Sequence, residues 1–430
     1  MAHASPEYDL VLLGATGYTG KYTAQYIAQH HPTDLKWAIA GRNSKKLAAV
    51  SETLKKLNGD RLEPAIEICE LEKADLDKLV KRTRLIITTV GPYAKYGEPV
   101  IEVCANNGTH YLDCTGEAPW LKKMIEKYHD TAKKNGAIMI PECGLDSVPT
   151  DLLSYALAQY IRKTFSSATA SVTVSMHNFK GGMSGGTAAS MMNIFSNFSL
   201  RELGAAMKPY ALSPSKPASP TPPPSSNIFY SLLGLRHIKE LGLLTTGPMA
   251  GLDTAIVHRS WGLFEQSSAA RDNPDLSYGP RFRFTEYMRT RNTLVGALIS
   301  GGFTAFGALL AFPPSRWIIG PLLTHFVLPA PGEGPTEDST KDDFLHYRAI
   351  GVADSKGKER AVAEWEVHTG AYAVTGLTLA EAAMVILKGD LASTEAGKMG
   401  GGLLTPATLG DQYVERLKAA GVRFEVGTSE

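Results

Sequence analysis

Tyr8-Asp9-Leu10-Val11-Leu12-Leu13 runs directly into Gly14-Ala15-Thr16-Gly17-Tyr18-Thr19-Gly20 near the start of the chain. An apolar strand, a Gly-x-x-Gly-x-x-Gly turn and a helix-compatible segment are typical of the phosphate-binding opening of a dinucleotide fold. One glycine permits the tight turn, one lets the backbone approach a pyrophosphate, and one brings the helix close to the strand. The alternative is a glycine-rich turn without a ligand. The residues that we expect at a dinucleotide are Gly14, Thr16, Gly17, Tyr18, Thr19 and Gly20.

A second strand is expected from Leu35 to Ala40, and it ends in Gly41-Arg42-Asn43, about 20 residues after the glycines. An NAD-specific site usually presents an Asp or Glu there to the ribose hydroxyls, and this chain has none. Arg42, with Lys45 close behind it, offers positive charge that suits the 2′-phosphate of NADP(H). The alternative is that these cations are solvated residues at the start of the next helix.

Strand-like and helix-like segments continue to alternate as far as residue 150. We expect strands at 65–69, 85–90, 110–113 and 137–141, and helices at 71–82, 98–107 and 120–135. This order predicts an α/β fold with a Rossmann-type doubly wound parallel sheet in a domain of residues 1–150. Ligands bind such sheets at the carboxyl ends of the strands, where 91–93, 114–117 and 142–146 would surround one crevice. Gly91, Pro92 and Tyr93 are therefore added to the expected cofactor site.

A second, α+β domain is expected over residues 151–375, for substrate or for association. It contains a strand at 168–177, a glycine cluster at 181–187 leading into a helix through about Met207, and a hairpin of 344–353 with 359–368. The glycine cluster either binds a substrate anion or forms a close turn with a helix cap. Residues 208–227 carry seven prolines and predict an exposed loop without a packed core. Helices at 377–387 and 406–419 would return residues 376–430 to the dinucleotide domain.

The composition is that of a globular enzyme of two domains. The 430 residues include 44 Lys and Arg against 43 Asp and Glu, which argues against nucleic acid as a partner. The four cysteines have no C-x-x-C spacing, and the start of the chain has no charged-then-apolar signal pattern. We therefore expect reduced thiols and an intracellular, cytoplasmic location.

Residues 292–315 contain no charged side chain, and a second apolar run continues to Leu328 after Pro313-Pro314 and Arg316. The first run is long enough to cross a bilayer core of about 30 Å. Two apolar arms around a Pro-Pro turn would suit a hairpin that enters a membrane leaflet or a lipid-droplet surface. The alternative is a glycine-rich helix buried between domains or between the subunits of a homodimer.

The sequence offers candidates for proton transfer but no Ser-His-Asp order and no metal-ligand spacing. Hydride transfer belongs to the cofactor, which leaves the protein to orient the substrate and supply a proton. Tyr93 is one candidate, with packing beside Pro92 as its alternative role. Asp113, Glu117 and Asp146 are the others, although carboxylates at strand ends often cap helices. The segment Asp146-Ser147-x-Pro149 in particular predicts a helix entry capped by Asp146 or Ser147.

Several motifs together resemble the saccharopine dehydrogenase-like oxidoreductases, and they extend over most of the chain. They are Gly14 to Gly20, Ala40-Gly41-Arg42, Thr89 to Tyr93, Tyr96-Gly97, Gly108 to Asp113, Thr115-Gly116-Glu117, Gly144 to Asp151, Ser184 to Thr187, Gly332 to Pro335 and Leu404 to Ala407. The resemblance implies an NADP(H)-dependent oxidoreductase. The family includes bacterial trans-acting enoyl reductases and eukaryotic proteins found on lipid droplets. The chain looks less like the true saccharopine dehydrogenases, whose turn and substrate segments differ.

The sequence as a whole predicts a reductase of an enoyl C=C, C=O or C=N bond in an apolar or acyl substrate, and the enoyl choice comes from the resemblance alone. A second hypothesis is a lipid-droplet or membrane protein that keeps the nucleotide fold with little turnover. A third is an amino-acid C–N dehydrogenase of the saccharopine type, which needs a basic site for substrate carboxylates.

Overall fold

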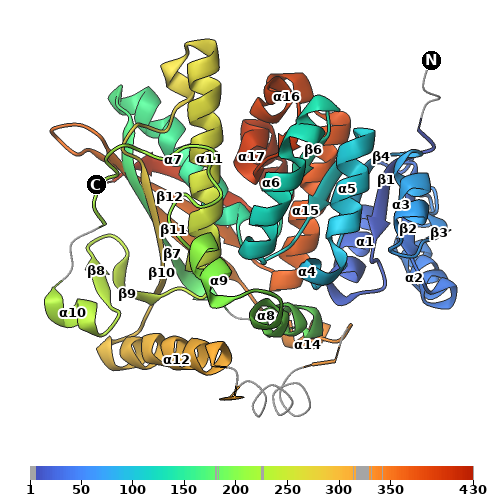
Figure 1. Ribbon diagram of the computed structural model, residues 1–430, viewed down its shortest axis with the longest axis horizontal. Coiled ribbons are helices and arrows are strands. Elements are labelled where there is room, and N and C mark those ends of the chain that lie inside the picture. The colour runs from blue at the N-terminus through green and yellow to red at the C-terminus, as the bar shows by residue number, and fades with distance from the viewer. Residues whose placement is uncertain are drawn as a thin grey trace.

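The computed structural model describes residues 6–179, 182, 184–223, 227–312, 314–315, 329–330, 332–340 and 342–429. Its elements form two seven-stranded sheets that stand side by side with helices packed on them (Figure 1). The second apolar run, and Gly181 and Met183 of the glycine cluster, fall outside these residues.

Sheet A has the strand order β13-β6-β5-β4-β1-β2-β3, and every pairing in it is parallel. Its strands are β1 (Tyr8–Leu13), β2 (Trp37–Gly41), β3 (Ala65–Ile68), β4 (Thr83–Thr88), β5 (His110–Asp113), β6 (Ile138–Ile140) and β13 (Gly402–Leu403). The strand order reverses between β1 and β4, which is the place where a doubly wound sheet binds its ligand. The predicted Rossmann-type sheet is confirmed, and β13 adds a strand that the sequence pattern did not indicate.

Helices cover both faces of sheet A because its strands are apolar on both sides. One face carries α1 (Tyr18–His30), α2 (Ser44–Leu57), α15 (Ala371–Lys388) and α17 (Gly410–Ala419). The other carries α3 (Lys73–Val80), α5 (Glu98–Asn107) and α6 (Ala118–Lys134), with the one-turn α4 (Tyr93–Tyr96) before α5. Helix α1 begins directly after Gly17, which stands at its N-cap.

Sheet B has the order β14-β12-β11-β7-β10-β9-β8. Its strands are β7 (Thr169–Phe179), β8 (Arg236–Ile238), β9 (Gly242–Thr246), β10 (Arg283–Arg289), β11 (Leu345–Ala353), β12 (Arg360–Val367) and β14 (Arg423–Thr428). Helices α7 (Val148–Phe165) and α11 (Ala250–Arg271) pack against it. The expected hairpin is present as β11 and β12. The chain's last strand, β14, pairs with β12, so residues 376–430 contribute to both sheets and not only to sheet A.

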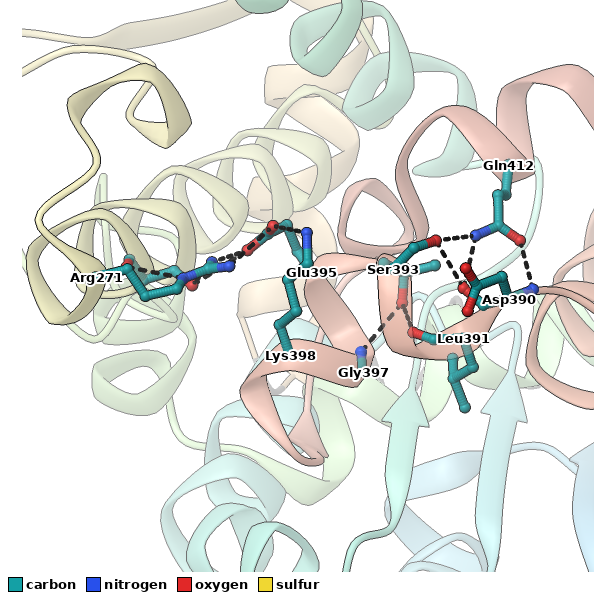
Figure 2. A network of polar contacts seen from close by, with 10 residues as sticks. Arg271, Asp390, Leu391, Ser393, Glu395, Gly397, Lys398 and Gln412 are labelled. Carbon is teal, nitrogen blue, oxygen red and sulfur yellow. Dashed lines mark hydrogen bonds and ion pairs between the residues drawn. The ribbon is translucent and has the colours of Figure 1, made fainter.

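The remaining helices are short or peripheral. They are α8 (Gly185–Asn197), α9 (Leu200–Ala206), α10 (Ile228–Leu232), α12 (Thr293–Ala311), α14 (Glu337–Thr340) and α16 (Glu395–Met399), with the 3-10 turns η1 (Pro274–Leu276), η2 (Leu391–Ser393) and η3 (Pro406–Leu409). The single helix expected through Met207 is in fact α8 and α9, because Ser199 and Glu202 form a capping box that starts a new helix. Figure 2 shows α16 held to α11 by an ion pair of Glu395 with Arg271.

The start of the proline-rich loop is packed, which corrects the expectation of an exposed segment. Tyr210 and Leu212 are buried. The ring of Tyr210 stacks on His258 with centroids 3.9 Å apart, and its hydroxyl donates to the carbonyl of Phe282 at 2.6 Å. The loop's prolines from Pro214 onward therefore follow two anchoring side chains, Tyr210 and Leu212.

Candidate active site at the strand ends of sheet A

The turn between β1 and α1 is too tight for side chains at two of its glycines. Gly14 has a φ of +94°, in the left-handed region that glycine adopts readily. A Cβ atom on Gly20 would lie 2.2 Å from the carbonyl oxygen of Gly14. A Cβ on Gly17 would approach only that same oxygen, at 3.3 Å. Gly14 and Gly20 therefore shape the turn, while Gly17 leaves room beside the backbone.

The N-terminus of α1 is free to receive an anion. Gly17 is its N-cap residue and provides no side-chain hydrogen bond, and no acidic side chain stands in the first turn. The first N–H groups of a helix lack intrahelical partners, and the helix dipole places positive potential there. Such a terminus beside a glycine turn fits a pyrophosphate.

The side chain of Tyr18 has partners other than the expected cofactor. Its hydroxyl donates to the carbonyl of Pro335, and its ring packs edge-on against Tyr372 with centroids 4.9 Å apart. The sequence predicts Tyr18 as a cofactor-binding residue, but only its backbone is left to contact the cofactor.

Arg42 follows β2, and Lys45 lies in the first turn of α2; both side chains are exposed. In the described part of the chain, neither forms an ion pair or a side-chain hydrogen bond. Asn43 fixes the local backbone, because its side chain caps α2 by accepting from the N–H of Lys46 at 3.0 Å. The two cations are thus free to meet a phosphate at the end of β2.

Tyr93 lies after the end of β4, and its side chain is buried. Its hydroxyl donates to the carbonyl of Thr88 at 3.0 Å and lies 3.4 Å from the sulfur of Cys114. Burial, with the nearby Cys114 and Asp113, raises the pKa of the phenol well above its usual value. These contacts favour the packing role over proton donation.

Glu117 acts as a backbone anchor. Its two carboxylate oxygens accept from the N–H groups of Tyr93 and Ala94, each at 2.8 Å, and so hold the first turn of α4 beside β5. Both oxygens of the Glu117 carboxylate are occupied by these hydrogen bonds, which agrees with the alternative that Glu117 caps a helix.

Asp113 at the end of β5 is also held by hydrogen bonds. It accepts from the N–H groups of Thr115 and Glu142, each at 2.9 Å, and from the hydroxyl of Tyr111 at 2.5 Å. Burial raises its pKa to about 6. Asp113 joins the loops that follow β5 and β6.

Asp146 is the candidate carboxyl that stays partly exposed, in the loop after β6. One of its oxygens lies 3.7 Å from where a Cβ of Gly116 would stand, and Leu252 of α11 borders the same point. Burial raises the pKa of Asp146 to about 6. The predicted helix entry is confirmed, with Ser147 as the N-cap residue of α7, but neither side chain forms a cap bond: the Ser147 hydroxyl donates to Asp253 at 3.0 Å.

In the part of the second glycine cluster that begins at Ser184, backbone N–H groups have hydrogen-bond partners. Ser184 caps α8 by accepting from Thr187, its N–H donates to the hydroxyl of Tyr372 at 2.6 Å, and the N–H of Gly185 donates to the carbonyl of Glu333 at 2.9 Å. These bonds favour the turn-and-cap alternative over an anion site.

Three buried carboxyls near Asp146 were missed as candidate residues. Glu142 follows β6, has a φ of +57° and is 1% exposed; Asp253 and Glu286 come from α11 and β10. One sequence feature could have identified Glu286. It is a carboxylate at an inward-facing position of an alternating strand, two residues after Phe284. No sequence feature identifies Asp253 as a candidate, because it lies among apolar residues of a helix. Within the described residues, no group of His, Cys, Asp and Glu has the arrangement of a metal site.

Comparisons with known proteins find similarity along nearly the whole chain. Residues 10–140 match the family model of the saccharopine dehydrogenase NADP binding domain. A relative from Mycobacterium tuberculosis, provisionally named a trans-acting enoyl reductase, is 33% identical over 97% of both chains. The trans-acting enoyl reductase of Mycobacterium ulcerans is 30% identical over 98% of both chains. Among solved structures, apo saccharopine dehydrogenase (L-Glu forming) from Saccharomyces cerevisiae covers 98% of this chain and 99% of its own, with a TM-score of 0.50 and 14% identity, and so shares the fold.

Proposed function

The chain belongs to the saccharopine dehydrogenase-like family that contains the trans-acting enoyl reductases, and on this premise we propose that it reduces the C=C bond of an enoyl group on an apolar acyl substrate. It is an NADP-dependent oxidoreductase, and its dinucleotide domain matches the family's NADP-binding domain. The uncapped N-terminus of α1 beside the glycine turn supports the nucleotide part of this proposal, because such a terminus suits a pyrophosphate.

The residues present fit NADP(H). The first-turn N–H groups of α1 and the open space at Gly17 would hold the pyrophosphate, and Arg42 with Lys45 would hold the 2′-phosphate. When bound, the cofactor supplies the hydride. Gly91, Pro92 and Tyr93 after β4 would border its other half, since the strand order reverses between β1 and β4.

Asp146 is the carboxyl that we assign to proton donation. It is partly exposed at a strand end, and a pKa of about 6 leaves part of its population protonated near neutral pH. Asp113 and Glu117 are committed to backbone hydrogen bonds and are better described as positioning residues. Asp146→Asn should lower turnover by about 10²-fold, with the exposed Asp130→Asn of α6 as its control.

The surroundings of Asp146 argue against a substrate with several carboxylates. Glu142, Asp253 and Glu286 lie near it, and in the described residues no Lys or Arg pairs with any of the four. A site of the saccharopine type needs cations for its substrate. An acyl substrate without extra negative charge fits this acidic region better.

The experiment is NADPH oxidation by the purified protein against a panel of enoyl thioesters, ketones and imino acids. We expect the enoyl thioesters to be reduced fastest, with activity rising with acyl chain length. Faster turnover of imino acids than of any enoyl compound would overturn the proposal in favour of an amino-acid dehydrogenase. If the protein binds NADPH but turns over no substrate, the result would favour a lipid-droplet or membrane protein that keeps the nucleotide fold with little turnover.

A second observation favours contact with a lipid surface. Helix α12 is long and apolar enough to cross a membrane, yet only 17% of it is buried; α15 passes the same test but is 78% buried, as a core helix is. Leu298 on α12 is 66% exposed and Leu232 on the neighbouring α10 is 81% exposed. The apolar surface of α10 and α12 consists of Ile228, Phe229, Leu232, Leu294, Leu298, Phe303, Phe306, Leu309 and Phe312.

This surface lies along one side of the molecule, away from sheet A (Figure 1). Its inner side is fixed to sheet B, since Thr245 of β9 donates to the carbonyl of Gly296 at 2.7 Å. Soluble monomers rarely expose so continuous an apolar patch. We infer that it lies on a membrane leaflet or a lipid-droplet monolayer, from which an apolar acyl substrate would come.

Flotation of the protein with phosphatidylcholine liposomes and with triacylglycerol droplets tests this inference. Leu298→Asp together with Phe306→Asp should abolish flotation, while Ile68→Asp, at an exposed apolar position on β3, should not. Light scattering in detergent-free buffer tests the alternative, that the surface is the interface of a homodimer. A homodimer that ignores lipid, and that the double variant converts to a monomer, would assign the surface to a second copy of the chain.

A further inference from the structure

The segments that carry the apolar surface of α10 and α12 bear unpaired charge of mainly one sign. Residues 227–247 span α10, β8 and β9, and residues 283–312 span β10 and α12. Together they contain two acidic side chains, Glu240 and Glu286. Glu240 pairs with Arg360 of β12 at 2.5 Å, and Glu286 is buried. The lysines and arginines of these segments have no acidic partner among the described residues; they are Arg236, Lys239, Arg283, Arg289 and Arg291.

Arg289 and Arg291 lie where β10 passes into α12, and both side chains are exposed. Between them, Thr290 is 7% exposed and packs on the helix, since a Cβ on Gly296 would come within 2.8 Å of its side chain. Asn292, the next residue of the chain, is the N-cap of α12. The two arginines are therefore held at the N-terminal end of the apolar helix.

A third arginine, Arg236 of β8, approaches the same end of α12. The residue before it, Leu235, packs on the helix, because a Cβ on Gly296 would come within 2.6 Å of the leucine side chain. The guanidinium of Arg236 lies 5.4 Å from the ring centroid of Tyr287. Tyr287 precedes Arg289 by two residues on β10 and so shares its face of the strand. The three arginines thus border the first turns of α12, where β8 and β9 also lie (Figure 1).

The positive charge of Arg289 is oriented but not cancelled. One of its terminal nitrogens lies 3.4 Å from Nδ1 of His177 on β7. Burial, followed by the charge of Arg289, lowers the pKa of His177 to about 3, so the imidazole is neutral and accepts from the guanidinium. Arg289 therefore remains a free cation at this edge of sheet B.

The apolar side chains beside these cations indicate what would meet them. Leu294 is 71% exposed and Leu298 is 66% exposed, both on the first turns of α12. Acyl chains take up apolar side chains, and lipid phosphates attract cations, so a bilayer with anionic headgroups satisfies both. A neutral droplet surface would satisfy only the leucines. A second copy of the chain, placed symmetrically, would bring the same unpaired arginines to this surface.

We propose that Arg236, Arg289 and Arg291 bind the headgroups of anionic phospholipids, and that α12 docks on a negatively charged membrane leaflet rather than on a neutral droplet monolayer. This inference rests on the lipid contact proposed above for the surface of α10 and α12. Each cation near a negatively charged membrane strengthens binding about fivefold. The three arginines together should favour anionic vesicles over neutral ones by about 10²-fold.

Sedimentation of the full-length protein with vesicles measures this preference. One set of vesicles is pure phosphatidylcholine, and the other contains equal parts of phosphatidylcholine and phosphatidylglycerol. We expect about 10²-fold tighter binding to the second set, and the difference should disappear at about 1 M salt, where the Debye length falls to about 3 Å. Equal binding to both sets would overturn the proposal and leave the lipid contact standing. Binding to neither set would overturn both.

Paired variants locate the preference. Arg289→Gln with Arg291→Gln should weaken binding to the anionic vesicles about 20-fold and leave binding to phosphatidylcholine unchanged. Lys133→Gln with Lys134→Gln, at exposed positions of α6, removes the same charge from the chain and should change neither. Arg289→Lys with Arg291→Lys keeps the charge and should bind like the wild type. An arginine pair of glutamines that binds anionic vesicles normally, or an α6 pair that loses as much, would overturn the assignment.

Thermal unfolding of each variant checks that the fold is intact. If Arg289→Gln does not fold, Arg291→Gln alone decides the point, because the Arg291 side chain makes no hydrogen bond or ion pair in the part of the chain that the structure describes. It should weaken binding to the anionic vesicles about fivefold. Unchanged binding by a folded Arg291→Gln protein would overturn the proposal.

Discussion

The hydroxyl of Tyr18 donates to the backbone carbonyl of Pro335 at 2.5 Å, which ties the first residue of α1 to a segment 317 residues later in the chain. The segment also packs its Gly334 against the Tyr18 ring, where a Cβ would come within 2.6 Å. Gly334 and Pro335 therefore support the glycine turn from the side, while the backbone of α1 remains available to phosphate.

Tyr18→Phe should keep the ring and lose one hydrogen bond. We expect a loss of about 1 kcal/mol in the free energy of unfolding and no change in the preference between NADPH and NADH, because the side chain does not meet the cofactor. Urea unfolding and nucleotide titration measure the two quantities. A selective loss of NADPH binding would show that Tyr18 contacts the 2′-phosphate after all.

Arg42 should set the choice of nucleotide. We expect NADPH to bind at least about ten times more tightly than NADH, since losing a charge-assisted phosphate contact costs about 1.5 to 3 kcal/mol. Arg42→Asp should reverse the preference, and Lys45→Ala should reduce it less, because a lysine offers no planar fork to the phosphate. Equal binding of both nucleotides by the wild type would contradict this assignment.

The glycines of the turn should respond differently to substitution. Gly20→Ala places a methyl group 2.2 Å from a backbone oxygen, so it should destabilise the fold by about 1 to 3 kcal/mol or more. Gly17→Val should instead weaken binding of both NADPH and NADH by crowding the pyrophosphate, with a smaller change in melting temperature. The comparison of thermal unfolding with nucleotide affinity separates the two roles. A Gly17→Val protein that binds both nucleotides normally would place the pyrophosphate elsewhere.

Most of sheet A could be predicted from the sequence because its determinants are local. Apolar strands, glycines and the absence of a carboxylate after β2 are each visible in a few consecutive residues. The environment of Asp146 could not be predicted in this way, because Asp253 and Glu286 reach it from elements more than 100 residues downstream. The burial of Tyr210 could not be predicted from the sequence either. Its stacking on His258 anchors a loop whose prolines alone indicate exposure.

Tyr93 is one of the proton donors that the sequence offers, and in the structure its hydroxyl bonds to the carbonyl of Thr88. Because the phenol bonds to Thr88 and its pKa is raised by burial, Tyr93→Phe should leave kcat within a few-fold of the wild type. It should lower the free energy of unfolding by about 1 kcal/mol through the lost hydrogen bond. Steady-state NADPH oxidation and urea unfolding check both statements. A drop of about 10²-fold in kcat with a normal KM for NADPH would restore the phenol as general acid.

Glu381 of α15 should make the docking of α15 on α1 dependent on pH. It accepts from the hydroxyl of Tyr26 at 2.9 Å and from Arg416 at 2.6 Å, and it lies 3.5 Å from His31. Burial acts to raise its pKa, but the contacts with His31 and Arg416 outweigh burial and hold the pKa below the usual value of 4.5. A carboxyl whose pKa is depressed by folding stabilises the protein fully above its unfolded pKa and loses that contribution as the pH falls through the folded value.

Glu381→Gln should therefore cost about 1 to 3 kcal/mol at pH 7, and the difference from the wild type should shrink as the pH falls below about 4.5. Urea unfolding at several pH values measures this difference. Glu415→Gln on α17, whose exposed carboxylate pairs with Lys418, is the matched control and should change stability little at any pH. A constant difference between wild type and Glu381→Gln from pH 7 to pH 3 would mean that Glu381 is not the ionised partner of Arg416 in the folded protein.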